Sequence, residues 1–142
     1  MTYAKGMPSD SQRLARAVIR LTRRLRQERH SELTPTQLAV LGTVGVMGPS
    51  TPSAIATREG VKPPSVTRTL NCLVDDGYVL REPHPDDRRQ VLVSLSDKGE
   101  DLMAEERIRR NLWLDARLAT LTVDERSTLR EASDLLERLA DE

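Results

Sequence analysis

The chain has 142 residues, and its 22 basic and 22 acidic side chains cancel to a formal charge of zero. Roughly 150 residues is usual for one domain, so we expect one compact chain. One cysteine and two histidines exclude a disulfide framework, a zinc finger and a cysteine–histidine metal cage. The first residues lack the apolar region of a signal peptide, and the longest nearly apolar run, 38–47, is far shorter than the ~20 residues of a membrane helix. We therefore expect a cytoplasmic protein with no metal, no cofactor and no membrane partner.

The zero net charge hides an uneven distribution along the chain. Residues 1–30 carry eight basic and two acidic side chains, residues 31–96 carry six and seven, and residues 97–142 carry eight and thirteen. The basic beginning and the acidic C-terminal part are electrostatically complementary. A solvated helix face is the alternative interpretation of the basic segment.

A long helix is predicted near the beginning of the chain. Ser9 and Gln12 have the spacing of a capping box, and the apolar pattern that follows continues to about Arg29. Its apolar residues form one narrow stripe, which is more typical of a helix that packs on a partner than of one enclosed by a core. The stripe contains Leu14, Val18, Leu21 and Leu25.

Three further helices follow. The segment Thr34–Gln37 begins one that stops near Gly48, and Thr51 caps a shorter one that ends at Gly60. The turn Val61–Pro64 leads into the third, which Gly77 ends. Two short helices joined by a tight turn are typical of a helix-turn-helix. Their predicted inward residues are Leu38, Leu41, Val44, Ile55, Ala56, Val66, Leu70, Leu73 and Val74.

The period then changes from 3.6 to 2, which predicts strands over Tyr78–Glu82 and Gln90–Leu95. The polar segment between them, Pro83–Arg89, is the predicted tip of a hairpin. A hairpin that directly follows a helix-turn-helix is a wing.

Two helices complete the chain. Ser96 or Asp97 caps the first, which is long, and Thr122–Glu125 is a capping box that begins the second. The predicted fold is mainly α with a small β-hairpin wing (α+β), a winged helix-turn-helix flanked by N- and C-terminal helices.

The helix after Val61–Pro64 exposes small hydroxyls and an arginine. With its apolar stripe directed inward, the outward face holds Ser65, Arg68, Thr69 and Cys72, and Lys62 protrudes near the N-terminus. Recognition helices place N-terminal residues on base edges in the major groove, and such side chains permit close approach and hydrogen bonds to bases and phosphates.

The hairpin tip carries two adjacent arginines. Arg88 and Arg89 on a rigid hairpin would reach the adjacent minor groove, whose negative potential attracts arginine. Asp87 is interpreted as a brace that holds a neighbouring guanidinium in one rotamer and reduces the entropy lost on binding. A solvated charged turn is the alternative interpretation.

Residues 34–99 resemble the winged helix-turn-helix core of the MarR (multiple antibiotic resistance regulator) family. The matching stretches are Ser65–Arg68, Leu73–Arg81 and Asp87–Gly99. The last is the most specific, with an Asp-x-Arg tip, an alternating strand, and then a helix that opens with Lys-Gly.

The resemblance implies a homodimeric repressor or activator, with repression the expected mode, that binds a pseudo-palindromic DNA operator. It implies an N-terminal dimerisation helix in residues 1–33, a DNA-binding domain in 34–96 and C-terminal dimerisation helices in 97–142. The expected dimerisation residues are Leu14, Val18, Leu21, Leu129, Leu136 and Leu139. The expected DNA-binding residues are Lys62, Pro64, Ser65, Thr67, Arg68, Thr69, Arg81, Arg88 and Arg89, with Asp87 as brace; the helical pattern puts Thr67 at the edge of the buried stripe.

Many members of the family bind phenolic acids, which implies a small aromatic or amphipathic effector. With few aromatic residues, a pocket here would be mostly aliphatic and lined by arginine, with Trp113 and Tyr3 as candidates; packing is the alternative role of Trp113. Cys72 stands where a basic residue is frequent in the family, and an ordinary small side chain or a redox sensor are its two interpretations.

The sequence leaves two other classes of function to consider, a protein–protein interaction module and an enzyme. The acidic C-terminal part and Cys72 suit a helical protein–protein interaction module, or an anti-activator that keeps the fold without binding DNA. An enzyme lacks a candidate catalytic site, because His84, Asp86 and Asp87 lie in a turn that offers no burial to perturb a pKa.

Overall fold

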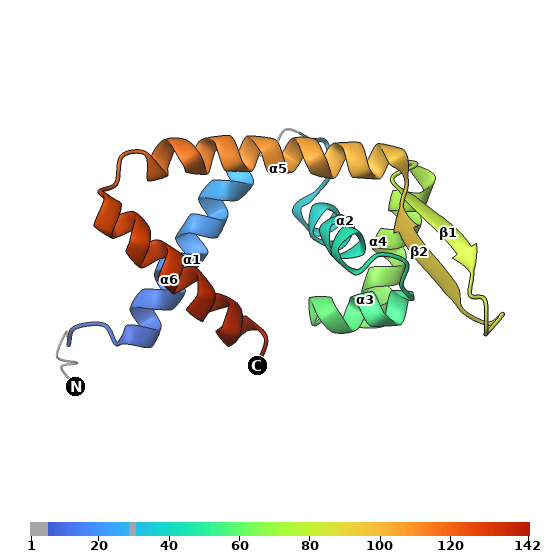
Figure 1. Ribbon diagram of the computed structural model, residues 1–142. Helices are drawn as coiled ribbons and strands as arrows, with labels where there is room; N and C mark the ends of the chain where they lie inside the picture. Colours follow the sequence, from blue (N-terminus) through green and yellow to red (C-terminus); the bar gives the residue numbers. More distant parts are fainter. Residues whose placement is uncertain (1–5, 29–30) are drawn as a thin grey trace. The chain divides into compact units, whose positions relative to one another are not determined.

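The computed structural model describes residues 6–28 and 31–142, which form six helices and a two-stranded sheet (Figure 1). The predicted fold class, mainly α with a β-hairpin wing, is confirmed. The described residues form two compact units, one within residues 29–108 and the other within residues 1–28 and 109–142. The elements are α1 (Asp10–Gln27), α2 (Pro35–Met47), α3 (Pro52–Glu59), α4 (Pro63–Asp75), β1 (Val79–Pro83), β2 (Val91–Leu95), α5 (Asp97–Leu118) and α6 (Val123–Ala140).

Capping boxes begin three of the helices, as their sequences predict. The side chains of Ser9, Thr34 and Thr122 each accept a hydrogen bond from the backbone N–H three residues later, and the side-chain oxygen at that later position accepts the backbone N–H of the capping residue. These pairs satisfy N–H groups that a helix N-terminus leaves without a partner. The last helical residue of α1 is Gln27, and the predicted end near Arg29 falls outside the described residues.

The core of the 29–108 unit lies where α2, α3, α4 and the hairpin meet. Leu41, Ile55 and Leu73 are completely buried in it, whereas Leu38 and Val74 are only partly buried at its margin. The amphipathic pattern thus placed the inward faces of the three helices correctly. The buried apolar residues are Leu33, Val40, Leu41, Val44, Ile55, Ala56, Val66, Leu70, Leu73, Val79 and Val93.

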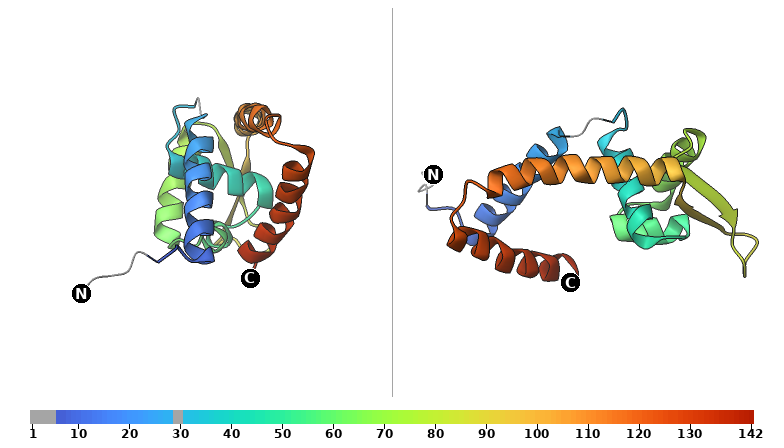
Figure 2. Two further views of the ribbon diagram at one scale, coloured as in Figure 1. Left: turned by 90° about the vertical axis from the view of Figure 1, so that its left-hand side faces the viewer. Right: turned by 45° about the horizontal axis from the view of Figure 1, so that its top comes forward.

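The wing is an antiparallel hairpin in which Val79 pairs with Leu95 and Pro83 with Val91. Pro83 was predicted at the tip but ends β1, a position that proline tolerates when its missing N–H points away from the partner strand. The hairpin projects beyond α2, α3 and α4 (Figure 1, and the right-hand view of Figure 2). On the other side of β2, the backbone of Ser50 exchanges two hydrogen bonds with that of Val93, at 2.8 and 3.1 Å.

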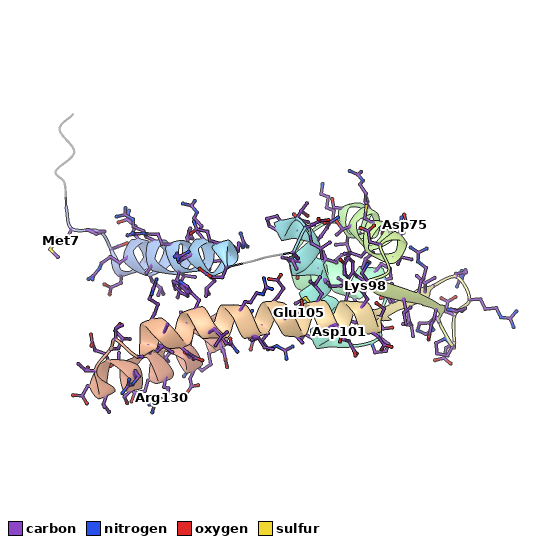
Figure 3. The ribbon with its side chains drawn as sticks, turned by 90° about the horizontal axis from the view of Figure 1, so that it is seen from above. Met7, Asp75, Lys98, Asp101, Glu105 and Arg130 are labelled. Carbon is purple, nitrogen blue, oxygen red and sulfur yellow. The ribbon has the colours of Figure 1, made fainter. Side chains whose placement is uncertain are left out.

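The start of α5 is tied to the end of α4 by polar contacts. Ser96, one of the two predicted caps, accepts a hydrogen bond from the Gly99 N–H at 3.1 Å and donates one to the Gly77 carbonyl. Lys98, labelled in Figure 3, donates to the Asp76 carbonyl at 2.7 Å. Its ammonium lies 4.3 Å from the centre of the Tyr78 ring. A Cβ on Gly99 would stand 2.2 Å from the Tyr78 carbonyl oxygen, so this close approach requires glycine.

In the second unit, α1 and α6 expose their apolar residues. Every residue of these two helices is at least partly exposed. The six residues expected at a dimer interface are 39% to 60% exposed; they are Leu14, Val18, Leu21, Leu129, Leu136 and Leu139. Within the described residues, each helix is too short or too polar to cross a membrane.

Candidate nucleic-acid interface

The exposed face of α4 is polar and close to the helix N-terminus. Lys62 is the N-cap residue, and the Pro63–Pro64 pair forms the first turn, where a missing N–H costs no helical hydrogen bond. The side chains expected to contact DNA are exposed at five positions, namely Lys62, Pro64, Ser65, Thr67 and Arg68. The opposite face, with Val66, Leu70 and Leu73, is buried. The core therefore fixes the rotation of α4 about its axis and directs these polar groups outward.

Two threonines differ from the positions that the helical pattern predicts. Thr67, predicted at the edge of the buried stripe, is exposed. Thr69, predicted on the outward face, is half-buried, and its hydroxyl donates to the Ser65 carbonyl at 3.1 Å. This local bond uses the donor of the hydroxyl within the helix, so Thr69 has less to offer a ligand than Ser65 or Thr67.

Arg81 on β1 is joined to α4. It is exposed, and its guanidinium donates a hydrogen bond to the side-chain oxygen of Asn71. The bond connects α4 to the hairpin and limits the directions in which the guanidinium can point. Asn71 was missed at the sequence level, because nothing in the local pattern relates residues ten positions apart on a helix and a strand.

The hairpin tip holds Arg89 next to Asp87. One carboxylate oxygen of Asp87 accepts the backbone N–H of Arg89 at 3.0 Å and lies 3.4 Å from its Nε. The Arg89 side chain is 93% exposed, against 35% for Asp87. The carboxylate thus contacts the near end of a guanidinium that otherwise faces solvent. Arg88 beside it is also exposed.

His84, the first residue after β1, forms hydrogen bonds with the backbone of the same hairpin tip. Its Nδ1 accepts the backbone N–H groups of both Asp86 and Asp87, each at 3.1 Å. The backbone N–H of His84 donates to the Gln90 carbonyl at 3.1 Å, which closes the loop across the hairpin. The sequence pattern raised His84 only as a catalytic group and did not indicate this role, because a lone histidine between two prolines gives no signal for it.

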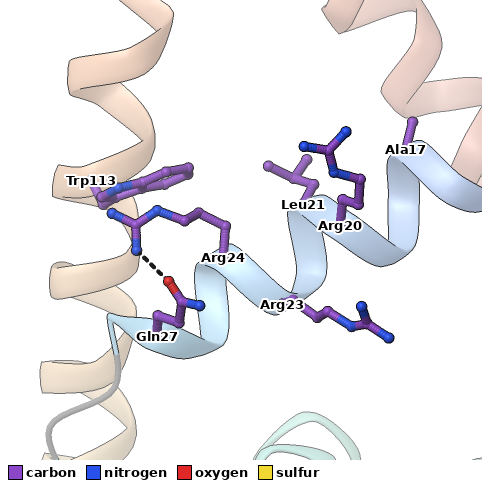
Figure 4. A pocket seen from close by; sticks show the side chains of 7 residues that line it. All are labelled: Ala17, Arg20, Leu21, Arg23, Arg24, Gln27 and Trp113. Atoms are coloured by element: carbon purple, nitrogen blue, oxygen red, sulfur yellow. Dashed lines mark hydrogen bonds between the residues drawn. The ribbon is translucent and has the colours of Figure 1, made fainter.

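A groove lies on α1 in the second unit, lined by arginines and Trp113 (Figure 4). The Trp113 ring is flanked by the guanidinium carbons of Arg24 and Arg117, each 5.0 Å from the ring centre. Its indole N–H is buried and has no hydrogen-bond partner among the described residues. Tyr3, the other aromatic candidate for an effector pocket, lies outside the described residues. The groove residues are Ala17, Arg20, Leu21, Arg23, Arg24, Gln27 and Trp113.

A helix-turn-helix of α3 and α4 followed by a hairpin with arginines at its tip defines a winged helix-turn-helix protein. Residues 33–91 match the model of the MarR family. An HTH-type transcriptional regulator from Mycobacterium leprae is 48% identical over 130 residues, which cover 91% of each chain.

Two solved structures extend the likeness to the whole fold. Wild-type MarR from E. coli superimposes with a TM-score of 0.78 at 26% identity, covering 94% of this chain and 98% of that one. FabT from Streptococcus pneumoniae, solved in complex with DNA, superimposes with a TM-score of 0.74 at 21% identity, covering 93% and 99%. The chain belongs to the MarR family and is a transcriptional regulator with a DNA-binding fold. The family and these relatives are regulators rather than enzymes.

Proposed function

We propose that the chain is a homodimeric repressor that binds a pseudo-palindromic operator, with α4 in the major groove and the wing in the minor groove. One observation carries the proposal: within one unit, a polar face of α4 and the exposed Arg89, braced by Asp87, are both available to a ligand. Major-groove recognition needs small polar side chains near a helix N-terminus, and a narrow minor groove attracts arginine.

The net charge is compatible with this function. Five of the six basic residues between positions 31 and 96 lie on α4, just before it, or on the hairpin. They are Lys62, Arg68, Arg81, Arg88 and Arg89. Because few phosphates would be neutralised, we expect modest sequence-independent affinity and a shallower salt dependence than for a strongly basic DNA-binding protein.

Dimerisation is supported by the exposed apolar residues of α1 and α6. Leucine and valine side chains are 39% to 60% exposed on these two helices, and large exposed apolar surfaces mark interaction sites in proteins. A second copy offers the same surface, and burying it against itself is the usual geometry of a symmetric dimer. We assign dimerisation to residues 1–33 and 97–142 and DNA binding to residues 34–96, in a cytoplasmic protein.

A small aromatic or amphipathic effector that releases the operator is the remaining part of the proposal. The α1 groove supports it, because Arg24 lies 5.0 Å from the centre of the Trp113 ring, and Arg20 and Arg23 add positive charge along the groove. Leu21 lines the groove and also belongs to the expected dimer surface, so a bound effector would act on the dimer. Trp113 is the one tryptophan in the sequence, and its fluorescence should change on titration with benzoate. No change with benzoate would remove the support for an aromatic carboxylate.

Operator binding is tested by a mobility-shift titration of the intact protein on the intergenic DNA upstream of its own gene. A shift is expected at ~50 mM salt, where phosphate contacts contribute most. No shift at that salt would contradict the proposal and favour a protein–protein interaction module, for which the acidic residues 97–142 would be the contact surface.

A further inference from the structure

The proposed function leaves unexplained the side chain that organises the hairpin tip. His84 is half-buried, and one acceptor atom, Nδ1, receives two backbone N–H groups, those of Asp86 and Asp87. An imidazole nitrogen accepts a hydrogen bond only when it carries no proton. The observed tip therefore requires Nδ1 to be unprotonated.

The contacts of His84 continue to the arginine expected in the minor groove. His84 holds the backbone of Asp87, and the carboxylate of Asp87 holds both the backbone N–H and the Nε of Arg89. The three residues form a series in which each fixes the next. Arg89 is 93% exposed, so this series is what restrains its near end.

From this series we infer that His84 is the positioning residue of the wing, and that protonation of its imidazole weakens operator binding. This inference rests on the proposed function. When Nδ1 takes up a proton, the backbone N–H groups of Asp86 and Asp87 lose their acceptor. The turn then keeps only its backbone bonds, from Gln90 to Asp87 and from His84 to Gln90, and the Asp87 carboxylate is held less firmly. Arg89 must then be ordered by the DNA itself, at a cost in entropy. Histidine is the side chain that commonly changes charge between pH 5 and 8.

Both acidic and basic side chains lie close to His84 in the sequence of the hairpin. Asp86 and Asp87 are acidic neighbours at the tip, and Glu82 precedes it on β1. Arg88 and Arg89 are the basic neighbours at the tip, and Arg81 lies on β1. A protonated imidazole also adds a positive charge close to DNA, which by itself would strengthen binding in acid. The positioning role predicts weaker binding in acid, so the sign of the pH dependence separates the two effects.

The test uses the full chain, a labelled operator duplex, and fluorescence anisotropy at pH 7.5 and 5.5. His84→Asn is the central variant, because its amide oxygen can accept the same two N–H groups and does not titrate. His84→Ala removes the acceptor, and His30→Asn removes the other histidine of the sequence as a matched control.

The wild type and His30→Asn are expected to lose affinity about tenfold between pH 7.5 and 5.5, because the DNA must then order the Arg89 side chain in both wings of the dimer. His84→Asn should match the wild type at pH 7.5 and keep its affinity at pH 5.5, and His84→Ala should bind weakly at both values. The inference is overturned if His84→Asn loses affinity in acid as the wild type does, or if His84→Ala binds like the wild type at pH 7.5.

A second readout needs no DNA. In NMR spectra of the free protein, the amide signals of Asp86 and Asp87 should shift between pH 7.5 and 5.5 in the wild type and stay in place in His84→Asn. Absence of DNA binding by the wild type at pH 7.5 would contradict the proposed function. Equal amide shifts in the two proteins would contradict the role of His84 in either case.

Discussion

Replacing Arg89 with alanine should weaken operator binding strongly and leave the fold unchanged. The side chain is 93% exposed, and its ion pair with Asp87 spans 3.4 Å at the surface. Pairs of this kind contribute only about 0–1 kcal/mol to folding, so stability should barely change. A specific side-chain contact to DNA contributes about 1–3 kcal/mol.

A dimer loses this contact in both wings. The lower end of this range in each wing gives about 2 kcal/mol per dimer, or about thirtyfold in Kd. The slope of log K against log salt should also become shallower, because each wing loses a positive charge that displaces counterions from the DNA.

Fluorescence anisotropy with the upstream operator between 50 and 200 mM salt, roughly the range in which phosphate contacts dominate, measures both quantities. Arg130→Ala is the matched control, because it removes the same charge from an exposed position on α6 (Figure 3). Circular dichroism and sedimentation check the fold and the oligomeric state. If the Kd of Arg89→Ala for the operator lies within about twofold of the Kd of Arg130→Ala, the assignment of Arg89 to the DNA contact is refuted.

Four further predictions follow from the same geometry. Asn71→Ala, which frees Arg81, should weaken operator binding less than Arg81→Ala does, and an equal effect in anisotropy would show that Arg81 acts only through that bond. Val18→Glu places a charge on the expected dimer surface and should weaken dimerisation about hundredfold or more in sedimentation, whereas an unchanged dimer would exclude α1 from the interface. Gly99→Ala should lower the free energy of unfolding in urea by about 1–3 kcal/mol, because its Cβ would stand 2.2 Å from the Tyr78 carbonyl oxygen. Gly42→Ala is the control, because its Cβ would meet only Met103, at 3.5 Å. Equal stability of the two variants would contradict the prediction. Hydrogen bonds from the backbone and then the side chain of Thr122 lower the pKa of Glu125, so its capping contribution should be present above the usual pKa of a glutamate and lost as pH falls through the lowered pKa. Thr122→Ala keeps the backbone donor and removes only the hydroxyl, so it should raise the Glu125 pKa without restoring its usual value. An NMR titration that finds the Glu125 pKa of the wild type not lowered would contradict this cause.

Local signals explain why much of the fold could be predicted from the sequence. The capping residues Ser9, Thr34 and Thr122 and the glycines that end α3 and α4 act within four residues of their helix ends, so their patterns are visible in a short window. The hairpin strands were predicted one residue early, at Tyr78 instead of Val79 and at Gln90 instead of Val91. Alternating apolar residues identify a strand, but its pairing decides where it begins.

The contacts that were missed join distant positions or use a residue in an uncommon role. The pairing of Ser50 with Val93 and the bond from Arg81 to Asn71 depend on how α2, α4 and the hairpin pack. The helical pattern alone predicted Thr69 on the outward face. It does not predict whether a threonine hydroxyl will donate to the carbonyl four residues earlier, as Thr69 does to Ser65. His84 accepts backbone N–H groups, a task more typical of Asp, Asn or Ser in turns, so its sequence context gave no warning.

The most direct test of the central claim is a hydroxyl-radical footprint of the intact protein on its upstream intergenic DNA. A symmetric dimer with α4 in the major groove should protect two equivalent half-sites whose centres are separated by about 10–10.5 base pairs or a multiple of that spacing. The wings should add minor-groove protection next to each half-site, and this part should disappear with Arg89→Ala. Protection without two-fold symmetry, or unchanged minor-groove protection in Arg89→Ala, would contradict the account.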